Sequence, residues 1–422
     1  MARFLRTTTR QRNQLYIIAF IVVCFLFIVT DHLADRHTAV NLDDVYDRPL
    51  EFNTGHDGPA DSSAAVANST RILIVTALFP LKRAKNGYDA YPGWVNRFLG
   101  SITTDVYFFC NEENAQMMRD LRRPGLPLII DTTFDSPFDT PPLKGLEAQY
   151  RKMHMIDRER SYHSPELYAV WNAKPFFVDY ATKLLARQGK HYDYIFWSDA
   201  GSFREDHVFK NWPYGPRVEQ VWREGAKLTG TPKEDLLFYP IYNPPPAHFK
   251  NWKAEDGPLD VDFSEGSFFG GSAKANEWWA KVFYGYHDYC ISQGFMCGKD
   301  QTVFNAVFML FPKRMITVWV YDPDAPAHGG LLPYINRGFL GACGPEWYYY
   351  QWWLSDRTTR DEMRALWLRG DREPWEARWW KVREPCRFTR VLSMVEVIRR
   401  TFKDKKWEPP LPLGIDFPDR DW

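Results

Sequence analysis

The stretch "DYIFWSDAGSFRED", residues 193–206, runs from apolar residues directly into a carboxylate. Residues 194–197 favour a buried strand, because a short continuous apolar run is typical of strands covered on both faces. Asp199 stands just past this run. Ligands of open α/β sheets bind beyond the carboxyl ends of strands, so Asp199 is a candidate site residue. An aspartate at this place also caps a turn well, and the stretch by itself leaves both interpretations open.

Strand and helix patterns alternate on both sides of this stretch. Runs of β-branched and aromatic residues predict strands at 71–79, 104–111, 126–134 and 192–197, and a strand that enters a glycine-rich turn within 261–272. Apolar periodicity predicts helices at 93–102, 164–189, 273–294 and 298–312. Pro175 falls inside the second of these and predicts a kink or a new helix start. The alternation predicts an α/β fold with a mixed, mainly parallel sheet flanked by helices.

The N-terminus carries a targeting signal. Residues 1–14 are basic, and the uncharged run Leu15–Val29 follows. As a helix this run spans about 22 Å, against about 30 Å for a hydrocarbon core, so a cleaved signal peptide and a short signal anchor both fit. We expect an anchor over residues 15–34, with the basic tail in the cytosol and the rest of the chain in the lumen. This predicts a single-pass type II membrane protein of the Golgi or endoplasmic reticulum.

The lumenal part divides by composition. Residues 35–70 are polar and small and predict a flexible stem. We expect a catalytic domain at 71–335 and an aromatic-rich extension at 336–422 that packs on it. Asn68 begins the one N-x-S/T sequon of the chain, and only a lumenal position would allow its glycosylation.

Composition excludes some partners. Lys+Arg and Asp+Glu balance at 53 each among 422 residues, so no global field draws the chain to nucleic acid. The 18 Trp and 22 Tyr fill a large core or line sugar-binding surfaces, and the sequence allows both.

Two further blocks carry polar residues that chemistry could use. Lys174 lies in an apolar helical stripe, where a lysine needs a partner or an exit to solvent, and it could reach phosphates. In "SEGSFFGGSAKANEWW", Glu265 could bind sugar hydroxyls, and Gly270 and Gly271 allow a close approach to the backbone. Ser272 can cap the helix that follows.

Two downstream positions complete the candidates. Asp300 and Gln301 stand at a helix start, so Asp300 is a helix cap, a base or an anchor for the acceptor. His328 is a candidate metal or phosphate ligand, although a lone surface histidine is the more ordinary interpretation.

These blocks together resemble a family. A strand ending in Trp-x-Asp-Ala-Gly, a preceding Trp-x-x-Lys helix, a Phe-Phe-Gly-Gly-Ser turn and a Gly-Lys-Asp-Gln segment are similar to HtrL/YibB-like proteins and related GT-A glycosyltransferases. The likeness covers roughly residues 71–312. It implies a GT-A-like, Rossmann-like sheet that binds a nucleotide-sugar, with a glycan or glycoprotein acceptor above it.

The resemblance also implies roles for single residues. Donor contacts are expected from Thr76, Lys174, Trp197, Asp199 and Gly201, and acceptor or sugar contacts from Glu265, Gly270, Gly271, Ser272 and Gln301. Asp300 and Asp199 are the expected catalytic residues, and Asp199 and His328 the expected metal ligands.

The family's Asp-x-Asp motif holds manganese on the donor diphosphate. Gly201 stands here in place of the second acid, so four alternatives remain: Asp199 holds manganese alone, Asp199 binds the ribose instead, Glu205 or Asp206 substitutes, or the reaction needs no metal. The sequence predicts a glycosyltransferase. A non-catalytic glycan-binding protein and another lumenal transferase, such as a sulfotransferase, are the alternatives.

Overall fold

The computed structural model describes residues 70–81, 90–320, 322, 347–370, 390–412 and 414–422. The expected anchor, the stem, Asn68 and His328 lie outside the described residues. No helix in the described ranges combines the length and the apolar character that crossing a membrane requires.

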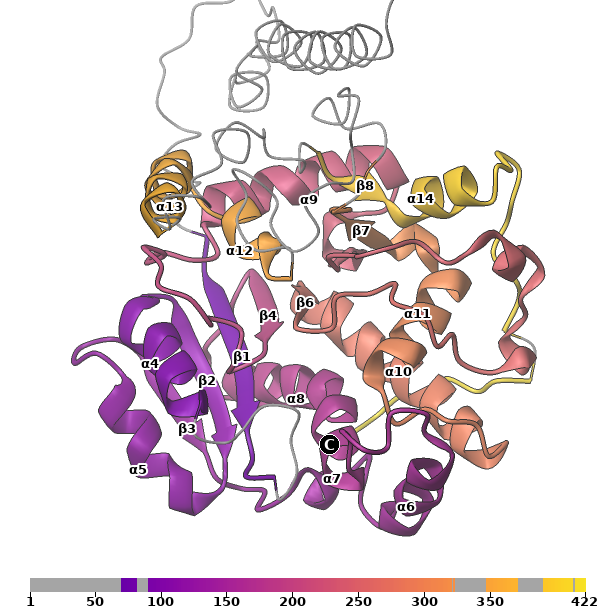
Figure 1. The fold of residues 1–422 in the computed structure, drawn as a ribbon, viewed down its shortest axis with the longest axis horizontal. Helices are drawn as coiled ribbons and strands as arrows, with labels where there is room; N and C mark the ends of the chain where they lie inside the picture. The colour runs from indigo at the N-terminus through magenta and orange to yellow at the C-terminus, as the bar shows by residue number, and fades with distance from the viewer. Residues whose placement is uncertain (1–69, 82–89, 321, 323–346, 371–389, 413) are drawn as a thin grey trace, which may run out of the picture.

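The described residues form a mixed sheet of eight strands (Figure 1). Its strands are β1 (Ile72–Leu78), β2 (Asp105–Cys110), β3 (Leu128–Asp131), β4 (Tyr194–Ser198), β5 (Leu237–Phe238), β6 (Phe268–Gly271), β7 (Met315–Thr317) and β8 (Leu392–Ser393). They lie in the order β3-β2-β1-β4-β6-β5-β7-β8. The first four are parallel to one another, β6 is antiparallel to β4 and β5, β7 is parallel to β5, and β8 is antiparallel to β7.

Helices cover this sheet. They are α4 (Tyr91–Ser101), α5 (Glu112–Leu121), α6 (Glu147–Ile156), α7 (Pro165–Asn172), α8 (Lys174–Arg187), α9 (Gly215–Thr229), α10 (Ala273–Ser292), α11 (Asp300–Leu310), α12 (Tyr349–Trp353), α13 (Arg357–Gly370) and α14 (Met394–Thr401). In Figure 1, α4 and α5 lie beside β3–β1, and α10 and α11 lie at the other side of the sheet. The α/β fold expected from the sequence is therefore confirmed.

Strand β4 shows why its sequence is apolar throughout. Tyr194 and Phe196 pack on Trp222 of α9, with ring centroids 4.8 and 5.7 Å apart. Trp197 points to the other face and stacks on Phe177 of α8 at 6.3 Å. Alternate side chains thus meet helices on opposite faces of the sheet, as expected for a central strand that is covered on both faces.

The helix expected at 164–189 is divided into two. Ser164 caps α7 by accepting a hydrogen bond from the backbone N–H of Leu167. That helix ends at Asn172, and α8 begins at Lys174 with Pro175 in its first turn. A proline lacks the backbone N–H that a helix interior uses, but the first turn does not need it. The break places Lys174 at the start of α8, next to the end of β4.

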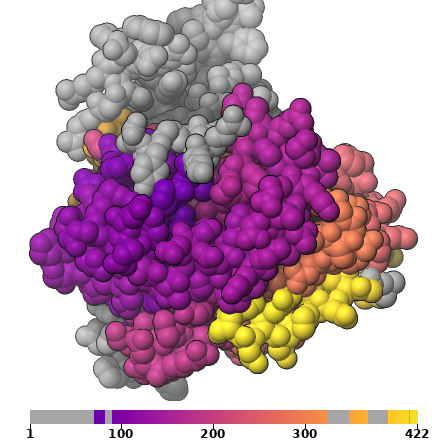
Figure 2. All heavy atoms as spheres, turned by 90° about the horizontal axis from the view of Figure 1, so that it is seen from below, coloured from indigo at the N-terminus to yellow at the C-terminus, as the bar shows by residue number. Residues whose placement is uncertain are grey.

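The C-terminal residues pack on the domain at several places. Tyr350 of α12 stacks on Phe268 of β6 with centroids 4.8 Å apart, and β8 pairs with β7. The last residue, Trp422, packs edge-on against Phe176 and Tyr284. Figure 2 shows this terminal segment (yellow) lying against the surface of the helical layer.

Candidate functional site

The site lies where β1 and β4 end side by side. The two strands are parallel, with Val75 opposite Trp197, so both carboxyl ends point to the same edge of the sheet. Asp199 follows β4, and its backbone N–H donates to the carbonyl of Ser267 at 2.9 Å. The indole N–H of Trp197 donates to Asp199 Oδ1 at 2.6 Å. These two hydrogen bonds hold the carboxylate at the mouth of the strand.

Lys174 joins two carboxylates that are far apart in the sequence. Its Nζ lies 3.1 Å from Asp199 Oδ1 and 3.0 Å from Asp300 Oδ2, and it donates to the carbonyl of Gly266 at 2.9 Å. One hydrogen bond and two ion pairs therefore surround this ammonium, although Lys174 is only 3% exposed. The partner that a lysine in an apolar stripe requires is this pair of acids.

The charges of this Lys174–Asp199–Asp300 triad are strongly coupled. Burial lowers the pKa of Lys174, but the two carboxylates outweigh burial and hold that pKa above its usual value. Burial raises the pKa of Asp300, and the ammonium of Lys174 opposes this shift. The side chain of Asp199 is 36% exposed, against 3% for Lys174 and 4% for Asp300. Asp199 is therefore the member of the triad that a ligand can reach.

Glu265 lies next to the triad but is sealed from solvent. It is 1% exposed, its Oε1 accepts a hydrogen bond from the backbone N–H of Ser267 at 3.3 Å, and its Oε2 has no partner among the described residues. Burial raises its pKa to about 8, so the carboxyl group is mostly protonated at neutral pH. Glu265 therefore does not contact a sugar in this arrangement.

A cleft opens above Asp199 and is lined by aromatic rings. Its lining residues are Ala77, Leu78, Phe79, Leu81, Tyr91, Leu167, Val170, Trp171, Lys174, Trp197, Asp199, Ala200, Gly201, Arg204 and Tyr348. The cleft volume is about 90 Å³, and a second cleft of about 120 Å³ shares Arg204 and Tyr348 with it. Small-molecule pockets measure about 300–1,000 Å³, so a nucleotide-sized ligand would have to extend past this shared rim.

Arg204 is the cation at this rim. Its guanidinium lies 4.5 Å from the ring centroid of Trp94 and 5.3 Å from that of Tyr348, and its Nε donates to the carbonyl of Gly201. No carboxylate of the described residues forms an ion pair with it, so its charge is available to a ligand. Sequence reasoning missed Arg204 and Tyr348. Arg204 stands in the opening stretch itself, but nothing local indicates that it faces the cleft.

Gly201 has little room for a side chain. A Cβ at this position would lie 3.2 Å from ring atoms of both Tyr91 and Trp94. An aspartate here would need these rings to shift by a few tenths of an ångström. The second acid of the family motif would therefore be crowded at this position, and it is absent from it.

The glycine pair and Ser272 lie away from the triad. Gly271 pairs with Ile195, towards the beginning of β4, whereas Asp199 follows the end of that strand. A Cβ on Gly270 would come within 2.2 Å of the carbonyl oxygen of Ile195, so this glycine is needed for close strand packing. Ser272 caps α10 by accepting from the backbone N–H of Ala275 at 3.1 Å. The structure thus explains these residues by the sheet and the helix cap.

Thr76 lies outside the cleft, whereas Gln301 lies next to the triad. Thr76 is fully buried within β1 and does not line the cleft. Gln301 lies beside the triad, where its backbone N–H donates to Asp300 Oδ1 at 2.8 Å and its side chain donates to the carbonyl of Ser264.

The residues of the site give poor support for a resident manganese ion. In the part of the chain that the structure describes, no group of three or more His, Cys, Asp or Glu side chains is placed to hold a metal. Asp199 Oδ1 already accepts from Trp197 and pairs with Lys174, and Asp300 pairs with the same ammonium. Asp199 is the one exposed carboxylate of the triad, and a divalent cation needs several oxygen ligands, so the described residues do not fit it.

Comparisons with known proteins give a distant likeness. No protein-family model and no curated protein matches this chain. Among solved structures, the X-ray structure of the mannosyltransferase Ktr4p from S. cerevisiae is similar with 10% sequence identity and a TM-score of 0.27. The match covers 58% of this chain and 57% of that chain. A likeness this weak does not assign a function to the chain.

Proposed function

We propose that this protein is a glycosyltransferase that moves a sugar from a nucleotide-sugar to a glycan or glycoprotein acceptor. The observation that carries the proposal is the place of the cleft. From β1, the chain adds β2 and β3 on one side and then places β4 on the opposite side of β1. Open α/β sheets bind nucleotides in the crevice between two such strands, where the order of the connections switches. The cleft is lined by the ends of these two strands.

Roles for the cleft residues follow from their charges. The triad holds two carboxylates against one ammonium, so its exposed member, Asp199, suits sugar hydroxyls better than a diphosphate. Arg204, which forms no ion pair with a carboxylate of the described residues, offers a cation at the rim and suits the diphosphate. Tyr91, Trp171 and Tyr348 supply ring faces for the base or the sugar. Asp300 acts through Lys174 as a positioning residue, because burial keeps it from the substrates.

The proposed mechanism does not depend on manganese. Lys174 supplies a positive charge between the two acids, and we expect the donor nucleotide to bind without added manganese. A lumenal location in the Golgi or endoplasmic reticulum also belongs to this proposal, and glycosylation of Asn68 in cells would support it.

Thermal unfolding of the full chain with nucleotides tests the proposal. UDP or GDP at about 100 times its Kd should stabilise the fold by about 2.7 kcal/mol, with or without manganese. Arg204→Gln should lose most of this protection, whereas Lys144→Gln, which removes an exposed lysine in the segment before α6, should keep it. Protection by adenosine 3′,5′-bisphosphate alone would indicate a sulfotransferase instead.

Sugar transfer distinguishes an enzyme from a glycan-binding protein. Lys174 forms ion pairs with both acids of the triad, and this arrangement would also suit a protein that binds a glycan without transferring a sugar. Asp199→Asn keeps the size of the side chain and removes its charge, and we expect it to lower the transfer rate at least 100-fold. Glycan binding with no transfer from any nucleotide-sugar would favour the non-catalytic alternative.

A further inference from the structure

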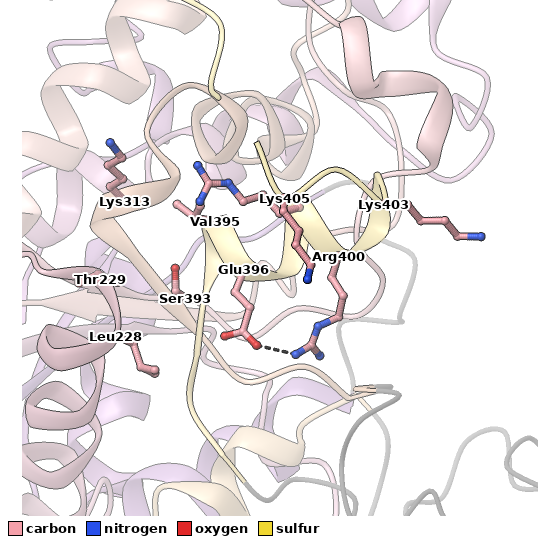
Figure 3. Close-up of a pocket in the computed structure, with 10 residues that line it drawn as sticks. Leu228, Thr229, Lys313, Ser393, Val395, Glu396, Arg400, Lys403 and Lys405 are labelled. Carbon is pink, nitrogen blue, oxygen red and sulfur yellow. Dashed lines mark hydrogen bonds and ion pairs between the residues drawn. The ribbon is translucent and has the colours of Figure 1, made fainter. Parts of the chain in front are cut away.

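A larger pocket lies at the β8 edge of the sheet, away from both clefts. It is bordered by the end of α9, the 3-10 turn Pro312–Arg314, β8 and α14, and its volume is about 760 Å³ (Figure 3). Its lining residues are Leu228, Thr229, Lys313, Ser393, Val395, Glu396, Arg399, Arg400, Lys403 and Lys405. This volume falls within the range of about 300–1,000 Å³ that is typical of small-molecule sites.

The lining of this pocket is strongly basic. Five lysine and arginine side chains line it against one carboxylate, although the whole chain has equal numbers of basic and acidic residues. The carboxylate, Glu396, is itself neutralised by Arg400 at 2.5 Å, as the dashed line in Figure 3 shows. Arg399 pairs with Glu408 at 2.5 Å. The local excess of positive charge is therefore not a consequence of composition.

Two of the lysines are not used by the fold. Arg399 and Arg400 stand in the last turn of α14, where cations stabilise the helix dipole. Lys313 comes from a different element, and Lys405 follows the helix. Neither lysine forms an ion pair with a carboxylate of the described residues. Their charges are available to a ligand.

A serine hydroxyl also lines the pocket. Ser393 is only 5% exposed and lines the pocket from β8. Figure 3 shows its side chain among the residues that line the pocket. A serine hydroxyl can donate one hydrogen bond and accept others, so it can contact a ligand there.

We infer that this pocket binds a small soluble ligand that carries two or more phosphate groups. Several cations from separate elements can each contact a different phosphate oxygen, and a serine hydroxyl can donate to another. A pocket of this volume, rather than a flat basic face, favours a small ligand over a membrane surface.

Titration calorimetry of the full chain with inorganic tripolyphosphate tests this inference. We expect one saturable site that weakens with salt. The double variant Lys313→Gln/Lys405→Gln should bind about tenfold more weakly, because it loses two charged contacts, and Lys313→Arg/Lys405→Arg should bind as the wild type does. The matched control Lys144→Gln/Lys190→Gln removes two exposed lysines outside the pocket and should leave binding unchanged.

Three results would overturn the inference. One is wild-type affinity in Lys313→Gln/Lys405→Gln, and another is an equal loss in the matched control, which would mean nonspecific attraction. The third is binding to vesicles that contain phosphatidylserine without binding to tripolyphosphate, which would assign the patch to a membrane.

Discussion

Replacing Lys174 with methionine tests the buried triad most directly. Methionine keeps much of the apolar volume of the side chain but leaves Asp199 and Asp300 facing each other without their ammonium. Removing one partner of a buried ion pair typically costs about 3–5 kcal/mol. Because Asp300 is only 3% exposed, solvent cannot compensate for the lost charge. We expect a loss of this size in the free energy of unfolding at pH 7.5.

The loss should depend on pH. Burial already raises the pKa of Asp300, and removal of the opposing ammonium raises it further. The folded variant then holds a proton that the unfolded chain has released above about pH 3.9. Its stability therefore falls as pH rises towards the folded-state pKa, by about 1.4 kcal/mol per pH unit. At pH 5 the deficit should shrink to about 1–2 kcal/mol, the value of the lost hydrogen bonds.

Urea unfolding at pH 5 and 7.5 measures both effects. Lys174→Met/Asp300→Asn should recover most of the loss and its pH dependence, since the uncompensated carboxylate is gone. Lys250→Met is the matched control. It breaks an exposed pair with Asp404 at 2.8 Å and should change the stability far less than Lys174→Met does. A deficit for Lys174→Met below about 1 kcal/mol, or one that does not change between the two pH values, would refute the reasoning.

Three further predictions concern single positions. Burial raises the pKa of Glu265 to about 8, so the stability that this carboxyl group contributes is lost as pH rises from about 4.5 through 8. In urea unfolding, the wild type should lose on the order of 4 kcal/mol by pH 9, and Glu265→Gln should not show this loss. Gly201→Asp should lower stability by about 1–3 kcal/mol through contact with Tyr91 and Trp94, and calorimetry should detect no gain in manganese binding. Lys403 has a φ of 52°, so Lys403→Gly should raise stability by about 1 kcal/mol, and a loss would contradict the assigned backbone conformation.

The central strands could be predicted because both of their faces are buried. Every residue of β1 is buried, and the same continuous apolar pattern reveals β4. The strands β5, β7 and β8 have only two or three residues, too few for a periodic pattern. The antiparallel direction of β6 was not predictable either, because direction depends on which strands it pairs with and not on its own residues.

The site could be predicted only in part, because its contacts join distant segments. The need of Lys174 for a partner is a local property of an apolar helix stripe, but its partners follow it by 25 and 126 positions. Gly270 and Gly271 were expected at the sugar pocket. Paired glycines indicate a close approach to the backbone, and that signal is the same whether a ligand or a neighbouring strand approaches. Here the neighbour is the carbonyl of Ile195.

The single acid after β4 follows from the charge balance of its surroundings. Lys174 already supplies one positive charge to Asp199 and Asp300, so the cluster carries an excess of negative charge. A carboxylate at position 201 would increase this excess and would also displace the rings that border Gly201. A covalently attached ammonium is held in place by α8 and costs no binding entropy when substrate arrives. A glycine at position 201 is therefore consistent with a site whose cation is part of the chain.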